Sequence, residues 1–126
     1  MSEFAERTDT GIRGRLYLEN FQVRRGAVTI TVENESGESW QLVFDFHLAV
    51  RVADEGYRLV SAPRLPPSGC GCRVLEARDS EFIRWVREES GGMTEVMIHT
   101  VVLTVDDIVE VVSFEPAVVH SGRATE

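Results

Sequence analysis

The sequence predicts an α+β domain that is mainly β, either an antiparallel meander or a partly closed barrel, packed by one helix and followed by a C-terminal β-hairpin. Three observations predict it. Apolar and polar residues alternate along the first half of the chain, as in half-buried strands. Residues 79–90 have the apolar spacing of a helix, and residues 96–114 hold two β-branched runs around a turn. This order of elements is typical of α+β folds, and an OB-type barrel shares it.

The first third of the chain predicts two strands joined by a short turn. Residues 12–24 form the first strand, with a kink allowed at Glu19, and Gly26 permits the turn that follows. In residues 28–33, Val and Ile alternate with Thr and Glu, so one face of the second strand is buried and the other is solvated. Residues 34–39 are rich in residues that favour turns and end this strand.

The longest alternating run begins at Trp40 and ends at Val52. A run of this length must bend or bulge, because strands usually span about five or six residues. We expect its even-numbered side chains to pack inward and its odd-numbered ones to face solvent. Residues 54–56 then predict a hairpin turn into a further strand at Tyr57. The expected inward set is Trp40, Leu42, Phe44, Phe46, Leu48, Val50 and Val52.

The helix is predicted over residues 79–90. Asp79 or Ser80 can cap its N-terminus, and the pair Gly91-Gly92 provides a left-handed stop. Its apolar stripe consists of Phe82, Ile83, Trp85 and Val86.

The C-terminal hairpin is predicted from residues 96–103 and 108–114. Both arms are apolar on both faces, which places them centrally in the sheet with the helix covering one side. Pro116 interrupts the pattern, and residues 117–119 are expected to form a short edge strand.

The whole chain fits a single domain. Its 126 residues can bury a core without a disulfide framework or a structural metal. Residues 1–10 and 121–126 carry no period and are predicted to be a flexible arm and a flexible tail around a globular unit, residues 11–120. Within that unit, residues 63–71 hold three prolines and two glycines and predict a long irregular connection.

The charge of the chain restricts its partners. The formal net charge of -8 repels nucleic-acid backbones and anionic membranes. All 13 basic residues are arginine, which excludes Schiff-base chemistry by lysine, a P-loop and a kinase-type lysine. The sequence has neither a secretory signal pattern nor an apolar run long enough to span a bilayer. We therefore expect a cytoplasmic protein that binds neither nucleic acid nor membrane.

Asp45, His47 and Arg51 fall on one face of the run that begins at Trp40. An Asp beside a His can orient a general base, but no Ser or Cys nucleophile is tied to this row by spacing. Alternation alone produces such a row on any solvated sheet face. We therefore treat the three residues as a candidate binding surface.

Acidic residues gather in the predicted turns. Glu35 and Glu38 lie in one turn, and Asp106 and Asp107 lie in another. The spacing of an EF-hand is missing, so solvated turns are the simpler interpretation. These tips would also attract a basic protein partner, since complementary charge accelerates encounter.

Cys70 and Cys72 are the candidate metal ligands. Two thiols can share a metal, but a closed zinc site needs four ligands, no second cysteine pair is present, and the histidines show no recognised spacing. Ordinary loop cysteines are the simpler interpretation, and we expect no cofactor.

No catalytic motif is recognised in the sequence. We expect a non-catalytic, acidic protein-binding module, such as an inhibitor, an immunity-type protein or an accessory subunit, that engages a basic partner through its acidic surface. One alternative is a self-assembling structural protein in which exposed strands pair between copies, which would make a homo-oligomer. Another is a small-molecule or metal-binding domain, or a minor enzyme, with a pocket near Asp45 and His47.

Overall fold

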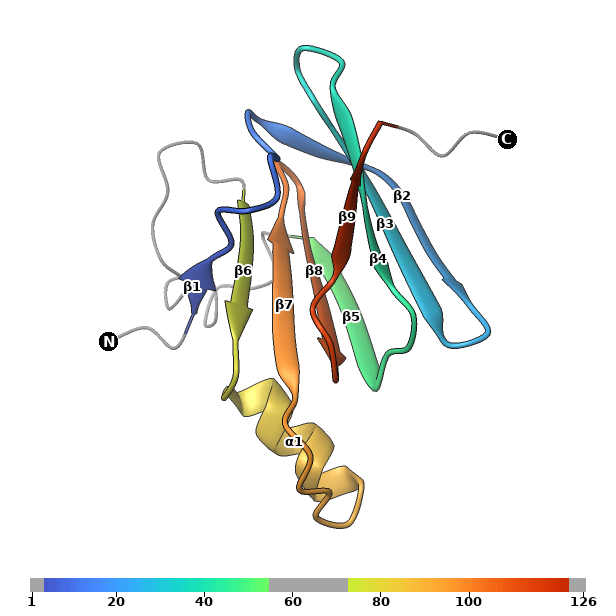
Figure 1. Ribbon diagram of the computed structural model, residues 1–126, viewed down its shortest axis with the longest axis vertical. Helices are drawn as coiled ribbons and strands as arrows, with labels where there is room; N and C mark the ends of the chain where they lie inside the picture. The colour runs from blue at the N-terminus through green and yellow to red at the C-terminus, as the bar shows by residue number, and fades with distance from the viewer. Residues whose placement is uncertain (1–3, 55–72, 123–126) are drawn as a thin grey trace.

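Two antiparallel sheets and one helix make up the described part of the protein, as the computed structural model shows (Figure 1). The structure describes residues 4–54 and 73–122. We call the five-stranded sheet, with strand order β1-β6-β7-β8-β5, sheet A, and the four-stranded sheet, with order β2-β3-β4-β9, sheet B. The predicted α+β, mainly β class is confirmed. The two sheets remain separate and open, so the barrel that we considered as an alternative does not form.

Sheet A takes its strands from three parts of the chain. Its centre is the predicted hairpin of β7 and β8, which lies between β6 on one side and β5 on the other. The two-residue strand β1 pairs with β6 at one edge. The bounds are β1 (Ala5–Glu6), β5 (Ala49–Asp54), β6 (Arg73–Ala77), β7 (Ile98–Leu103) and β8 (Asp107–Ser113).

Sheet B is a meander completed by the last strand. The turn between β2 and β3 is made by Arg25 and Gly26, both with positive φ, as the two-residue turns that match the twist of a hairpin require. A bulge between Leu18 and Asn20 falls at the predicted kink. After Pro116 the chain returns to pair with β4 at the edge of the sheet. The bounds are β2 (Leu16–Arg24), β3 (Ala27–Asn34), β4 (Ser39–Phe44) and β9 (Val118–Ser121).

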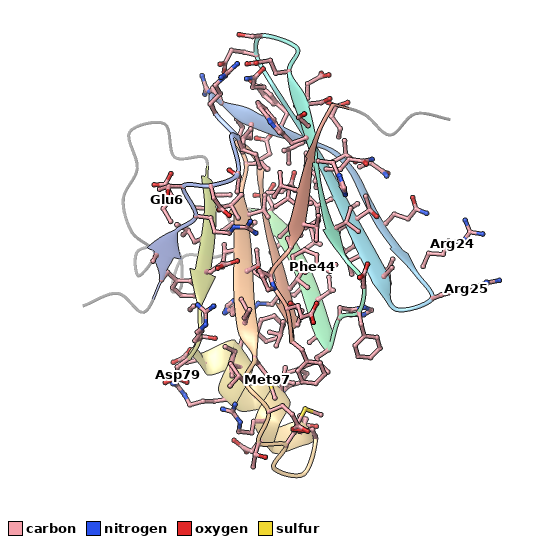
Figure 2. All side chains as sticks on the ribbon, viewed as in Figure 1. Glu6, Arg24, Arg25, Phe44, Asp79 and Met97 are labelled. Atoms are coloured by element: carbon pink, nitrogen blue, oxygen red, sulfur yellow. The ribbon has the colours of Figure 1, made fainter. Side chains whose placement is uncertain are left out.

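The main core lies between the two sheets. Ile30 and Phe44 point from sheet B toward Val102 and Val111 of sheet A, and all four belong to one buried cluster. Phe44 is 2% exposed and lies between the sheets (Figure 2). Burying a side chain of this kind contributes about 1.5–3 kcal/mol. This apolar layer therefore holds the sheets together.

Helix α1 (Glu81–Glu89) is capped as the sequence predicts. Ser80 Oγ accepts a hydrogen bond from the backbone N–H of Ile83 at 3.1 Å, and the glycine pair follows the last turn. The helix packs on the outer face of sheet A, the face turned away from sheet B, where it contacts Met97 and Val112. Its buried residues are Phe82, Ile83 and Val86.

The long run from Trp40 to Val52 is divided between both sheets. Strand β4 ends in sheet B, residues 45–48 cross over, and β5 begins in sheet A. The expected inward packing holds through β4, but Phe46 is 57% exposed and Val52 is 43% exposed, so the prediction is wrong for these two. The crossing interrupts the alternation of buried and exposed side chains, and β5, at the edge among the described strands, has less cover than a central strand.

Part of the predicted N-terminal arm is attached to sheet A. Beyond the pairing of β1 with β6, Phe4 packs against a cluster that contains Leu75 and Val101, and the backbone N–H of Arg7 donates to Val74 O at 2.9 Å. An apolar side chain and backbone hydrogen bonds thus fix this segment although it shows no sequence period. The predicted strand at Tyr57, the connection over residues 63–71 and the last residues of the predicted tail lie outside the described residues.

Candidate functional site

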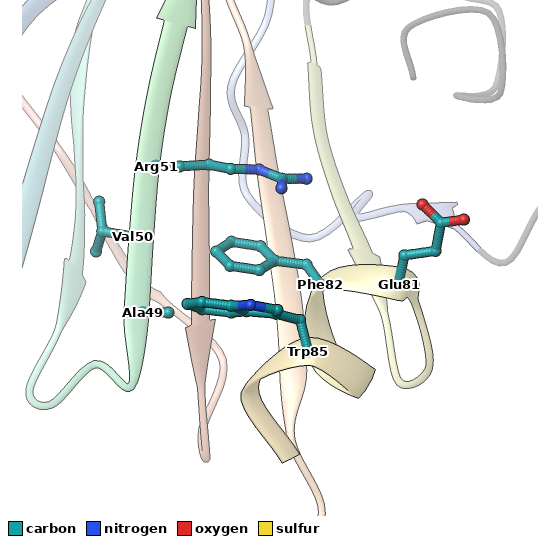
Figure 3. Close-up of a pocket in the computed structure, with 6 residues that line it drawn as sticks. All are labelled: Ala49, Val50, Arg51, Glu81, Phe82 and Trp85. Atoms are coloured by element: carbon teal, nitrogen blue, oxygen red, sulfur yellow. The ribbon is translucent and has the colours of Figure 1, made fainter. Parts of the chain in front are cut away.

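A cleft of about 530 Å³ opens between strand β5 and helix α1 (Figure 3). Its volume is within the range of about 300–1,000 Å³ that is usual for ligand pockets. One wall comes from the start of β5 and the other from the first half of α1. The cleft is lined by Ala49, Val50, Arg51, Glu81, Phe82 and Trp85.

The cleft reaches the edge of sheet A. Among the described residues, β5 pairs with β8 on one side and with no strand on the other. Ala49 and Arg51 line the cleft, and so does Val50, although its side chain points away from the helix (Figure 3). Backbone N–H and C=O groups at such an edge are available to a further strand.

Arg51, Phe82 and Trp85 lie one above another in the cleft (Figure 3). The Cζ atom of Arg51 is 4.2 Å from the centroid of the Phe82 ring, which is a cation–π contact. The Phe82 and Trp85 rings are 6.0 Å apart between centroids. Phe82 is 6% exposed, whereas Trp85, which the sequence predicts in the apolar stripe, is 55% exposed. The stack therefore ends in an indole that is open to solvent.

Behind the cleft, Arg51 is held by a buried chain of hydrogen bonds. Its Nε and Nη2 donate to Glu110 Oε2 and Oε1 at 2.8 and 3.1 Å. His99 Nε2 lies 2.8 Å from Glu110 Oε1, and because a carboxylate only accepts, this nitrogen is assigned the proton. His99 Nδ1 lies 2.8 Å from Ser80 Oγ. We call Arg51, Glu110, His99 and Ser80 the buried relay.

The buried relay connects the two walls of the cleft. It starts at Arg51 on β5 and ends at Ser80, whose oxygen also caps α1. The His99 ring is fixed by edge-to-face contacts with Phe4 and Phe82, at 5.1 and 5.2 Å between centroids. The position of the arginine and the position of the helix therefore depend on the same network.

Ser80, His99 and Glu110 have the residue types of a hydrolytic triad but not the access that one needs. Ser80 is 3% exposed, and its oxygen already contacts the His99 ring and the N–H of Ile83. A nucleophile must reach a substrate carbonyl, and this hydroxyl is covered. The geometry is that of a structural network.

The Arg51 guanidinium retains hydrogen-bonding capacity toward the cleft. Burial lowers its pKa, and the nearby Glu81 carboxylate opposes this lowering. The group stays protonated at neutral pH, because an arginine guanidinium is not deprotonated in proteins. Its Nη1 makes no hydrogen bond within the part of the chain that the structure describes.

The structure separates the predicted row of Asp45, His47 and Arg51, since only Arg51 lines the cleft. Asp45 and His47 lie in the crossing between β4 and β5, where the chain leaves one sheet for the other. The ring Nδ1 and the backbone N of His47 lie 2.7 and 3.0 Å from Gly26 O. His47 therefore fastens the β2–β3 turn. Asp45 is exposed.

The acidic candidates lie away from the cleft lining. Glu35 accepts a hydrogen bond from the backbone N of Arg15 at 2.9 Å, and Glu38 pairs with Arg13. These two carboxylates thus stabilise their own turn. Asp106 is exposed in the turn between β7 and β8, and Asp107 begins β8. None of the four lines the cleft.

Glu38 is expected to make stability depend on pH. Hydrogen bonds, first from Arg13 and then from Asn34, hold the pKa of Glu38 below its ordinary value of 4.5. A carboxyl with a lowered folded pKa stabilises the fold above the unfolded pKa, and that stabilisation is lost as pH falls through the folded pKa. Glu38→Gln should therefore melt below the wild type at pH 7, and the difference in Tm should vanish in acid. Thermal unfolding across this range measures it, and a difference that does not change with pH would contradict the assignment.

The described residues contain no group of three or more His, Cys, Asp or Glu side chains that could hold a metal ion. Cys70 and Cys72 lie outside the described residues. In residues 4–54 and 73–122, no helix combines the length and the apolar character that crossing a membrane requires.

The sequence does not predict most of the cleft and of the buried relay. It predicts a helix cap at Asp79 or Ser80, and the structure shows Ser80 in that position. It does not predict Glu110, which is 2% exposed. The available signal was the position of Glu110 between two valines in the middle of β8. A carboxylate at such a position is buried only when a strong partner compensates its loss of hydration.

Comparisons of the chain with protein-family models, with curated proteins and with solved structures find no match.

Proposed function

We propose that the protein is a non-catalytic binding module that docks an extended segment of a partner protein along β5, in the cleft between β5 and α1. The observation that carries this proposal is the cleft itself, which joins a strand edge to an aromatic wall. Adding a strand to an exposed sheet edge is a recurring mode of peptide recognition, in which backbone hydrogen bonds provide affinity and side-chain pockets provide specificity.

The walls of the cleft suit an anchoring side chain. Trp85 offers a large, half-exposed indole, and Ala49, the smallest lining residue, lies beside it (Figure 3). Tryptophan is among the residues that most often dominate binding energy at interfaces. An apolar or aromatic-stacking side chain of the docked segment would cover Trp85 while its backbone pairs with β5.

The buried relay favours binding over catalysis. It ties the arginine of one wall to the cap of the other, so both walls are positioned before a ligand arrives. Preorganisation of this kind improves affinity because less motion has to be arrested on binding.

Filling the cleft tests this proposal. Linear peptides selected on the wild type from a phage-displayed library should bind Ala49→Phe at least about tenfold more weakly, because the added ring occupies the cleft. Fluorescence polarisation of labelled peptides measures the affinity. Val118→Phe, a change of the same kind at a 56% exposed position on β9, is the control and should bind as the wild type does. Selected peptides that bind Ala49→Phe with unchanged affinity would rule out this cleft.

A second copy of the chain is the competing occupant. The edge position of β5 among the described strands favours it, because an edge strand can pair with its counterpart in another copy. Sedimentation velocity over a range of concentrations separates the two. A dimer of the wild type that is lost in Ala49→Phe would indicate self-assembly, and a monomer throughout leaves the peptide as the occupant.

A further inference from the structure

We infer that the cleft receives a cationic side chain, arginine or lysine, which the docked segment places over the Trp85 indole. This inference rests on the proposed function and adds the chemistry of the partner. It follows from three observations: carboxylates lie near Trp85, the arginines of α1 bind other groups, and Arg51 already makes a cation–π contact in the cleft.

Carboxylates flank Trp85 along the exposed side of α1. Glu81 lies four residues before it, and Glu88 and Glu89 lie three and four residues after it. Residues at these spacings are neighbours on a helix surface. A cation that stacks on the indole would therefore lie near the carboxylates of the following turn.

The negative charge on this side of the helix is not neutralised by the helix's own arginines. Arg84 pairs with Asp79 at 3.0 Å, and Arg87 donates to the carbonyl oxygens of Met93 and Glu95. The carboxylates of Glu88 and Glu89 make no hydrogen bond or ion pair with the described residues. The chain as a whole carries a formal net charge of -8, so a basic segment is also attracted from a distance.

Arg51 does not turn the cleft into an anion site. The Arg51 guanidinium forms a bidentate ion pair with Glu110, and this carboxylate compensates the positive charge from the side away from the cleft. Glu81 on the opposite wall places a second carboxylate near this guanidinium. Among the described residues, an anionic ligand would therefore meet two carboxylates beside one guanidinium.

The protein already contains the contact that we propose. Arg51 stacks on one ring of the cleft, Phe82, at 4.2 Å. Trp85 is the next ring of the same stack, it is 55% exposed, and tryptophan is the strongest of the aromatic residues for cations. A second guanidinium or an ammonium on Trp85 extends this arrangement by one layer.

Three hexapeptides with blocked ends test the inference. The first alternates threonine with arginine, the second replaces arginine with the uncharged isostere citrulline, and the third alternates threonine with valine. We expect the arginine peptide to bind at least about tenfold more tightly than the citrulline peptide at low salt, and the ratio to shrink as salt is added. Fluorescence polarisation of labelled peptides measures the affinity for the wild type and for every variant. In the wild type, the NMR shift of the Trp85 indole N–H also reports contact with this ring, and acetylarginine methylamide shows whether a free cation suffices.

Variants of the protein test whether the cation binds at Trp85. Trp85→Ala should remove most of the advantage of the arginine peptide, and Glu88→Gln combined with Glu89→Gln should reduce it about threefold. These positions are exposed, so the fold should survive, and a thermal melt checks it. Glu115→Gln, an exposed acid after β8, is the control and should leave the ratio unchanged.

The outcomes separate the inference from the proposed function. Equal affinity of the arginine and citrulline peptides, with binding still blocked by Ala49→Phe, would overturn the inference and keep the docking cleft. An arginine peptide that binds equally well to the wild type, Trp85→Ala and Ala49→Phe binds elsewhere and overturns both. If none of the three hexapeptides binds while the peptides selected from the library still bind in the cleft, the cationic anchor is also overturned.

Discussion

Replacing Glu110 with alanine is expected to lower the free energy of unfolding by about 3–5 kcal/mol, the usual effect of removing one partner from a buried charge network. Glu110 is 2% exposed and accepts hydrogen bonds from Arg51 and His99. Without it, the Nε2 proton of His99 loses its acceptor in a buried place, and a cavity remains where the carboxylate was. Equilibrium unfolding in urea measures this loss.

The matched variant for this prediction is Glu110→Gln. The amide keeps the shape and one acceptor oxygen but not the charge, so the expected loss is smaller, about 1–2 kcal/mol. The exposed acid Glu115 provides the baseline, and its change to glutamine should stay within about 0.5 kcal/mol. A Glu110→Ala protein with the same urea midpoint as the wild type would show that the buried relay does not stabilise the fold.

Replacing Phe44 with alanine is expected to cost about 3–5 kcal/mol, whereas the same change at Phe46 should cost less than about 1 kcal/mol. The two residues are two positions apart in one alternating run, and the sequence predicts both in the core. In the structure Phe44 is 2% exposed between the sheets, and Phe46 is 57% exposed in the crossing. Thermal unfolding of the two variants side by side measures the difference.

This pair of variants is its own control, because residue type and sequence pattern are the same. Similar losses for Phe44→Ala and Phe46→Ala would mean that β4 continues past its observed end and that the crossing is placed wrongly. A large loss at Phe44 alone would support the crossing of the chain from sheet B to sheet A at residues 45–48.

Local pattern was sufficient to predict most of the individual elements. The alternation of β3, the cap at Ser80 and the turn that separates β7 from β8 all depend on residues close together in the sequence. Such features carry their own physical signal, since a side chain must face one side of a strand and a helix must satisfy its first N–H groups. For this reason the fold class and most of the elements were predicted correctly, whereas β1 and β6 were not predicted.

The division into two sheets was not predictable in the same way. Alternation from Trp40 to Val52 continues through the crossing with no break in residue type, so it cannot indicate that β4 and β5 join different sheets. The attachment of Ala5–Glu6 to β6 also depends on partners about seventy residues away in the sequence, with Ala5 opposite Glu76. Pairing partners at this distance leave no local period.

The candidate site was the least predictable part. Arg51 was singled out, but beside Asp45 and His47 rather than beside Phe82 and Trp85. The cleft exists only because α1 lies over the outer face of sheet A next to β5, and this is a tertiary arrangement. Trp85 has the spacing of a buried residue, but it lies beside β5, the last described strand at this edge of sheet A, and is exposed.

Sheet B brings the consequence that residues 45–117 must be synthesised before this sheet can be completed. Strand β4 needs β9 as its outer neighbour, and Trp40 lies opposite Ser121. During translation, the edge of β4 therefore lacks β9 while the segment between these two strands is being made. Such distant pairings slow folding and prolong the exposure of apolar strands, so the nascent chain is most prone to aggregate before β9 arrives.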